Sequence, residues 1–164
     1  MKDKINATLK KIEEFNREVP SAIMPKTTAE LLRLLILSTK SKKILEIGCS
    51  VGYSAIWMAS AAKELGGHVY TMDKSVDRSE LARINFENAG LSKDITLLEG
   101  DALDILKSWN KGPMDFILID AMKKQYLEYY NLAFPLLNNG GIIIADDVNK
   151  FKEKMKDFLE YVKK

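Results

Sequence analysis

The stretch KKILEIGCSVGYS, residues 42–54, decides the fold of this chain. An apolar run at 44–47 stops at Gly48, a short loop reaches Gly52, and a helix-like segment begins at Tyr53. This order predicts a strand, a tight glycine turn and a helix. In an open α/β sheet, ligands bind outside the carboxyl ends of the strands, and the first strand-to-helix turn usually contacts the cofactor. We therefore expect a nucleotide-like cofactor at this turn.

The composition is that of one ordinary globular domain. The chain has 164 residues, of which 46% are hydrophobic and 29% are charged, and this length suffices for a buried core. Its formal net charge of +2 is small, so nucleic acid is permitted as a partner but not indicated. Cys49 is the single cysteine, so no intrachain disulfide can form, and no apolar run approaches membrane-spanning length. We expect a cytoplasmic protein without a membrane partner.

Apolar strands alternate with amphipathic helices along the chain. Strands are expected at 44–47, 68–72, 95–98, 114–119 and 142–145. Helices are expected before Pro20, after a cap at Thr27 or Thr28, from Tyr53 to Leu65, from about Ser79 to Ala89, and from Phe151 to the C-terminus. This alternation predicts an α/β fold in which helices cover both faces of a mostly parallel sheet.

The same pattern predicts one domain over residues 1–164. Its expected parts are N-terminal helices at 1–40, a cofactor-binding core at 42–148 and a C-terminal helix at 149–164. No repeat, linker or low-complexity segment interrupts it.

Acidic residues follow the predicted strands repeatedly, as Asp73, Asp101, Asp120, Asp146 and Asp147. The carboxyl ends of parallel strands meet at one edge of the sheet, so these acids are expected to gather there. Like charges repel, and stability alone does not explain such a cluster. Each acid taken singly could instead cap the next helix.

The glycine spacing narrows the choice of cofactor. The turn reads G-x-x-x-G, from Gly48 to Gly52, and lacks both the G-x-G-x-x-G of dinucleotide sites and the Gly-Lys-Ser/Thr of phosphate loops. A cofactor without phosphates therefore suits this turn best, and a dehydrogenase is the weakest alternative. Asp73, about 20 residues beyond the turn, is placed to accept hydrogen bonds from two ribose hydroxyls. Asp101 could accept one from an adenine amino group.

Taken together, these motifs resemble the S-adenosylmethionine (SAM)-dependent O-methyltransferases of the catechol and caffeoyl-CoA type. The matching motifs are Glu46-Ile47-Gly48, Gly52-Tyr53-Ser54, Asp73, Glu99-Gly100-Asp101-Ala102, Asp120 with Lys123 and Tyr126, and Asp146-Asp147-Val148. The resemblance runs from about Met24 to Asn149. It implies a Rossmann-like three-layer α/β/α methyltransferase fold with strand order 3-2-1-4-5, lacking the last two strands of the family.

The resemblance also implies which residues hold SAM and its product S-adenosylhomocysteine (SAH). The residues implied at the methionine end are Glu46, Gly48, Ser50, Tyr53 and Ser54. Gly52 and Asp120 are also expected to bind the cofactor. Asp73 would hold the ribose, and Asp101 with Ala102 would lie at the adenine.

By the same resemblance, a divalent metal, most simply magnesium, is held by Asp120, Asp146 and Asp147. Asp147 stands where asparagine is usual in the family. Magnesium prefers oxygen ligands, whereas a third carboxylate adds repulsion to the empty site. The open alternatives are manganese or calcium, a site not used in the family's manner, or acids that only cap the last helix.

Lys123, three residues after Asp120, matches the family lysine that assists deprotonation of the acceptor hydroxyl. We expect Lys123 and Asp120 to be the catalytic residues. A lysine accepts a proton only if burial or neighbouring charge depresses its pKa.

The predicted activity is methyl transfer from SAM to a hydroxyl of a small, catechol-like acceptor, assisted by the metal. The alternatives are methylation of a hydroxylated tRNA base and a cofactor-binding but inactive module. If the chain ends at Lys164, the strand at 142–145 lies on an exposed edge, which proteins usually cover. We therefore expect a homodimer or another homo-oligomer formed through this edge.

Overall fold

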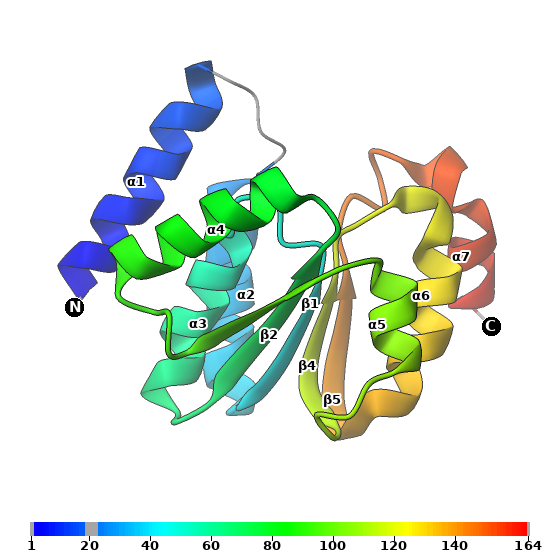
Figure 1. Ribbon diagram of the computed structural model, residues 1–164. Coiled ribbons are helices and arrows are strands. Elements are labelled where there is room, and N and C mark those ends of the chain that lie inside the picture. Colours follow the sequence, from blue (N-terminus) through cyan, green and yellow to red (C-terminus); the bar gives the residue numbers. More distant parts are fainter. Residues whose placement is uncertain (1, 19–22, 164) are drawn as a thin grey trace.

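The computed structural model describes residues 2–18 and 23–163. Its centre is a five-stranded parallel sheet with the order β3-β2-β1-β4-β5 (Figure 1). The strands are β1 (Lys43–Ile47), β2 (His68–Asp73), β3 (Ile95–Glu99), β4 (Met114–Ile119) and β5 (Leu137–Ala145). The predicted α/β fold and its strand order are confirmed.

Helices cover both faces of the sheet and make three layers. One layer contains α1 (Lys2–Glu18), α2 (Lys26–Thr39), α3 (Tyr53–Glu64) and α4 (Val76–Ala89). The other contains α5 (Ala102–Lys107), α6 (Tyr126–Ala133), α7 (Lys156–Tyr161) and the short 3₁₀ helices η1 (Lys123–Gln125), η2 (Phe134–Leu136) and η3 (Lys152–Met155). In Figure 1, α1 and α7 lie at opposite ends of the molecule.

The central strand β1 shows why the apolar run at its core is so continuous. Ile44 packs into the hydrophobic cluster under α2, α3 and α4, whereas Leu45 and Ile47 pack into the cluster under α6 and α7. All three side chains are completely buried. A parallel strand with helices on both faces has no solvent side, so apolar residues stand on both of its faces, and the buried Glu46 is the exception within the run at 44–47.

Two helices begin earlier than the sequence suggested. α4 begins directly after Ser75, because the hydroxyl oxygen of this residue accepts the N–H of Arg78. α2 begins directly after Pro25, whose carbonyl oxygen accepts the N–H of Thr28. Neither Thr27 nor Thr28 is therefore the cap of this helix.

The last two elements also differ from expectation. β5 begins at Leu137, opposite Met114, and continues through a register shift opposite the segment between Met114 and Phe116. The predicted final helix is two short pieces, η3 and α7, instead of one helix from Phe151. Pro20 lies outside the described residues.

The outer edge of β5 carries no further strand among residues 2–18 and 23–163. Self-association through this edge stays a prediction. None of the helices in the described ranges is long and apolar enough to cross a membrane.

Candidate active site

A cavity of about 650 Å³ opens at the carboxyl edge of the sheet. Every strand contributes to its wall through the residues that follow it, and the segment at 23–25 before α2 adds to one side. Ligand sites in open α/β sheets lie at this edge, and the volume is that of a small-molecule site. The predicted residues that line it are Gly48, Ser50, Tyr53, Ser54, Asp73, Asp101, Ala102, Asp120, Lys123, Asp146 and Asp147.

Two glycines let the first turn pack closely against its neighbours. Gly48 has a φ of +100°, and a Cβ placed on it would lie 2.1 Å from the carbonyl oxygen of Asp120. Gly52 has a φ of +85°, and its Cβ would lie 2.5 Å from the ring of Phe86 on α4. Only glycine combines this backbone conformation with this close approach. The G-x-x-x-G spacing therefore reflects backbone packing, on β4 at one glycine and on α4 at the other.

Asp73 holds the turn from the side of β2. Its Oδ2 accepts the N–H of Ser50 at 2.7 Å and its Oδ1 accepts the N–H of Ser75 at 2.9 Å. Ser50 has a φ of 49°, a conformation uncommon for residues other than glycine. A carboxylate has about four acceptor positions, so Asp73 retains acceptors for ligand hydroxyls while it fixes the turn.

Glu46 lies beneath the turn and does not line the cavity. Its side chain is completely buried and accepts hydrogen bonds from the hydroxyls of Ser54 and Thr71. Burial raises the pKa of Glu46 from its ordinary 4.5 to about 8, although these two hydrogen bonds act in the opposite direction. Glu46 therefore orients Ser54, which does line the cavity.

This buried carboxyl group makes the stability of the fold depend on pH. The folded state keeps the Glu46 proton up to about pH 8, whereas the unfolded chain releases it near 4.5. The folded state binds more protons between these values, so the free energy of unfolding falls as pH rises through this window.

The side chain introduced by Glu46→Gln cannot ionise, so this variant is expected to remove the fall in the free energy of unfolding as pH rises. A shift of each pKa unit corresponds to about 1.4 kcal/mol, so the variant should gain several kcal/mol relative to the wild type between about pH 5 and about pH 9. Urea unfolding at both pH values measures the gain. Parallel pH profiles for the two proteins would contradict this assignment.

Asp101 begins α5 at the next strand end. Its Oδ1 accepts the N–H of Leu103 at 2.9 Å, so this acid is the N-cap of the helix. The side chain is nevertheless exposed to the cavity beside Ala102. Helix capping and ligand binding are thus compatible at this residue, since its second oxygen has no bonded partner in the described part of the chain.

Lys123 joins the acids after β4 and β5. Its Nζ donates to Asp120 Oδ1 at 2.7 Å and to the Tyr126 hydroxyl at 2.9 Å, and it lies 2.9 Å from Asp147 Oδ2. Burial disfavours the charged amine, but the Asp120 charge and the three partners outweigh it and raise the pKa of Lys123. In this arrangement Lys123 is an ammonium that holds its proton, contrary to the depressed pKa that a base would need.

The three acids expected to hold a metal are engaged with other partners. Asp120 and Asp147 share the Lys123 ammonium, and Asp146 Oδ1 accepts the N–H of Asp147 at 2.7 Å. Over the ranges that the structure covers, no three His, Cys, Asp or Glu side chains are arranged to hold a metal ion. As arranged, the Lys123 ammonium lies between Asp120 and Asp147, and a divalent metal held by these acids would require that ammonium to move.

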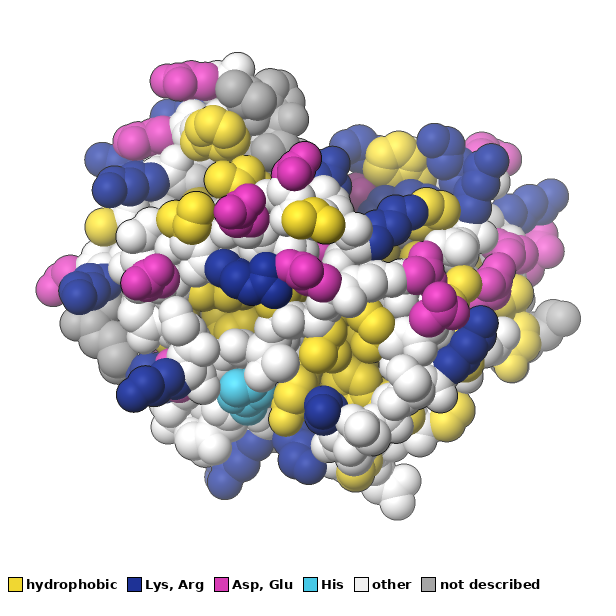
Figure 2. Space-filling view, in the orientation of Figure 1, with side chains coloured by type: hydrophobic (Ala, Val, Ile, Leu, Met, Phe, Trp, Pro, Cys, Tyr) yellow, Lys and Arg dark blue, Asp and Glu magenta, His cyan; other side chains and the backbone are white. Residues whose placement is uncertain are grey.

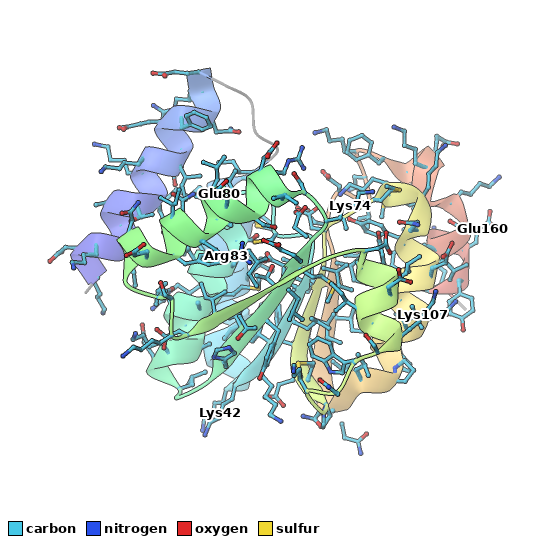
Figure 3. The ribbon with its side chains drawn as sticks, in the orientation of Figure 1. Lys42, Lys74, Glu80, Arg83, Lys107 and Glu160 are labelled. Atoms are coloured by element: carbon cyan, nitrogen blue, oxygen red, sulfur yellow. The ribbon has the colours of Figure 1, made fainter. Side chains whose placement is uncertain are left out.

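The cavity wall includes side chains that the sequence did not single out. Lys74 and Arg78 follow β2, and Lys150 with Phe151 follows β5. Figure 3 shows Lys74 at the upper edge of the sheet, between the two layers of helices. Their position after strand ends was a usable signal, since the acids were found in that way. The segment at 23–25 carried no such signal.

Phe151 is surrounded by ammonium groups. The nitrogens of Lys123, Lys150 and Lys154 lie 5.8, 5.1 and 5.3 Å from the centre of its ring. Lys and Arg side chains gather at the upper right of Figure 2, over the segment that follows β5. This side of the cavity combines an aromatic surface with positive charge.

The family comparison covers nearly the whole chain. Residues 2–156 match the family model described as O-methyltransferase. A catechol O-methyltransferase from Niastella koreensis is 35% identical over 133 residues, which are 79% of this chain and 60% of the relative. Caffeoyl-CoA O-methyltransferase 1 from Zea mays is 33% identical over 147 residues, 85% of this chain and 57% of the relative. The chain spans about 60% of the length of these curated relatives.

Solved structures share the same architecture. An O-methyltransferase from Bacillus cereus in complex with SAH has a TM-score of 0.85 at 31% identity, and the match covers 94% of this chain and 78% of that one. The O-methyltransferase TomG from Streptomyces achromogenes, in complex with SAM, has a TM-score of 0.84 at 26% identity over 96% and 76% of the two chains. The chain therefore belongs to the O-methyltransferase family that its motifs resemble, together with the catechol and caffeoyl-CoA enzymes.

Proposed function

We propose that this protein transfers the methyl group of SAM to a hydroxyl of a small, catechol-like aromatic acceptor. One observation carries the proposal: the glycine turn and the Asp120–Lys123 pair line the same cavity. A methyl donor at the turn would thus lie beside groups able to act on an acceptor oxygen. Family membership and the SAH and SAM complexes of the neighbours support it.

The residues along the carboxyl edge of the sheet would hold the cofactor. The turn at 48–54, where Ser54 is held by the buried Glu46, would bind its methionine end. Asp73 would accept hydrogen bonds from the ribose hydroxyls through its remaining acceptors, and Asp101 with Ala102 would lie at the adenine. When bound, the cofactor supplies a sulfonium methyl group as the electrophile.

The acceptor lies on the side of Lys123 and Phe151. There an acceptor ring packs on Phe151, and the Lys123 ammonium donates to the oxygen that carries the developing negative charge. The carboxylate of Asp120 takes the hydroxyl proton. With SAM bound, the oxygen lone pair would form the new O–CH₃ bond, and the electron pair of the broken S–CH₃ bond would stay on sulfur, so that SAH would be the product. Positioning the two reactants supplies much of the acceleration.

Binding and transfer test the two halves separately. The purified chain is expected to bind SAH in calorimetric titration and to move labelled methyl from SAM to catechol. Absence of binding at millimolar SAH would contradict the cofactor half. Binding without transfer to catechol or related hydroxylated rings would contradict the acceptor half and favour the inactive module.

The same assay tests the hypothesis from the sequence that a divalent metal assists methyl transfer. If it does, EDTA should abolish transfer and Mg²⁺ should restore it, which requires Lys123 to release Asp120 and Asp147. Transfer that is indifferent to both additions would leave the Lys123 ammonium as the cation that serves the acceptor oxygen.

A further inference from the structure

The N-terminal helix α1 lies outside the sheet and packs against α4 and α3 (Figure 1). Its apolar stripe, Ile5, Leu9 and Ile12, is buried in the cluster that also contains Phe86 and Tyr53. α1 is therefore a docked element, whose hydrophobic face anchors it on the layer that supports the cofactor turn.

One polar contact links α1 directly to the cavity. The hydroxyl of Tyr53, the first residue of α3, donates to Glu13 Oε1 at 2.6 Å. Tyr53 is only 2% exposed and lines the cavity together with Ser50 and Ser54. Burial and the Glu13 carboxylate raise the pKa of Tyr53, so its hydroxyl remains a donor across the physiological range.

This bond joins α1 to the first residue of α3. Gly52, the N-cap of α3, has no side chain to cap the helix, so contacts from other elements are needed to fix its start. Besides Asp73 and Glu46, described above, two contacts from the helical layer fix this region: Glu13 accepts from Tyr53, and Asn85 donates to the carbonyl oxygen of Val51 at 2.9 Å. A charged acceptor makes the Glu13 bond one of the stronger kind.

We propose that Glu13 is a positioning residue for the cofactor site: through Tyr53 it fixes the first turn of α3, so that cofactor binding and docking of α1 stabilise each other. This inference rests on the SAM site proposed above. Because such coupling is reciprocal, loss of the α1 contact weakens binding of the cofactor, and the bound cofactor slows hydrogen exchange in α1.

Five variants test the coupling through the dissociation constant of SAH. Glu13→Ala is expected to raise it about fivefold, the lower end of typical coupling between sites, and Tyr53→Phe should raise it similarly. Glu13→Gln should lie between the wild type and Glu13→Ala, because an amide oxygen accepts the same bond without the charge. Glu14→Ala, one residue along α1 at an exposed position, is the matched control and should change nothing. The double variant Glu13→Ala/Tyr53→Phe should bind no more weakly than either single variant.

Hydrogen exchange of α1 with and without SAH supplies the second measurement. SAH should slow exchange in α1 of the wild type and of Glu14→Ala, but not of Glu13→Ala. A Glu13→Ala protein that melts earlier yet binds SAH normally, or additive effects in the double variant, would overturn the coupling. A wild type that fails to bind SAH would overturn the proposed function together with it.

Discussion

Replacing Gly48 with alanine is expected to destabilise the fold by at least about 3 kcal/mol and to abolish SAH binding. The new Cβ would lie 2.1 Å from the carbonyl oxygen of Asp120, which belongs to the backbone and cannot rotate away. The φ of +100° adds strain for any residue with a side chain. Relief requires the turn to move off the end of β4, and that movement separates the two walls of the cavity.

Gly90→Ala is the matched control for Gly48→Ala. Gly90 also has a positive φ, +70°, but a Cβ there would meet no atom within 4 Å. It should therefore cost only about 1 kcal/mol and leave SAH affinity unchanged. Urea unfolding and calorimetry measure both quantities, and equal costs for the two variants would show that the contact with Asp120 is not the cause.

Replacing Lys123 with methionine is expected to slow methyl transfer at least about 100-fold while SAH affinity stays close to the wild type. The side chain contacts the acids after β4 and β5, on the acceptor side of the cavity, and its ammonium would stabilise the acceptor oxygen. Removing it also leaves Asp120 and Asp147 without their shared partner. The fold should lose about 2 kcal/mol near neutral pH as a result.

Two further variants separate the charge from its position. Lys123→Arg keeps the positive charge but not the compact ammonium. We therefore expect it to have the stability of the wild type, while its rate of methyl transfer stays low. Lys124→Met removes the adjacent exposed lysine and should change neither. Single-turnover rates with labelled SAM and thermal melts measure the effects. Full transfer by Lys123→Met would contradict the proposed role.

The sheet was predictable because its signals are local. Each strand is a short apolar run followed by an acid or glycine, and the turn at Gly48 marks the first strand-to-helix crossing. The start of β5 was missed because Gly140 and Gly141 indicate a turn, and the backbone does depart from extended geometry there: Gly140 has a φ of +81°, and the register with β4 shifts between Leu137 and Ile142. The pairing of Leu137 with Met114, ahead of this irregularity, is a tertiary contact that local preference does not encode.

The site was only partly predictable, for a different reason. Strand ends located Asp73, Asp101 and Asp120 at one cavity, but sequence could not reveal which partner each acid binds. The Lys123 ammonium between Asp120 and Asp147 depends on side-chain geometry that no spacing encodes. The role of Glu13 could not be predicted from the sequence, because a glutamate on an amphipathic helix usually faces solvent and its partner, Tyr53, lies far along the chain.

The central position of β1 bears on the order in which the chain folds. Its pairing with β2 follows a single crossover, whereas its pairing with β4 joins Ile44 to Phe116 and must close a much longer loop. Long-range parallel pairing forms slowly, because closing the long loop lowers the entropy of the chain before the stabilising contacts between the strands have formed. Gly48 packs on the end of β4, so the cavity assembles only after that late step. We therefore expect SAH binding to appear only after β1 has paired with β4, so that binding times this step in a refolding experiment.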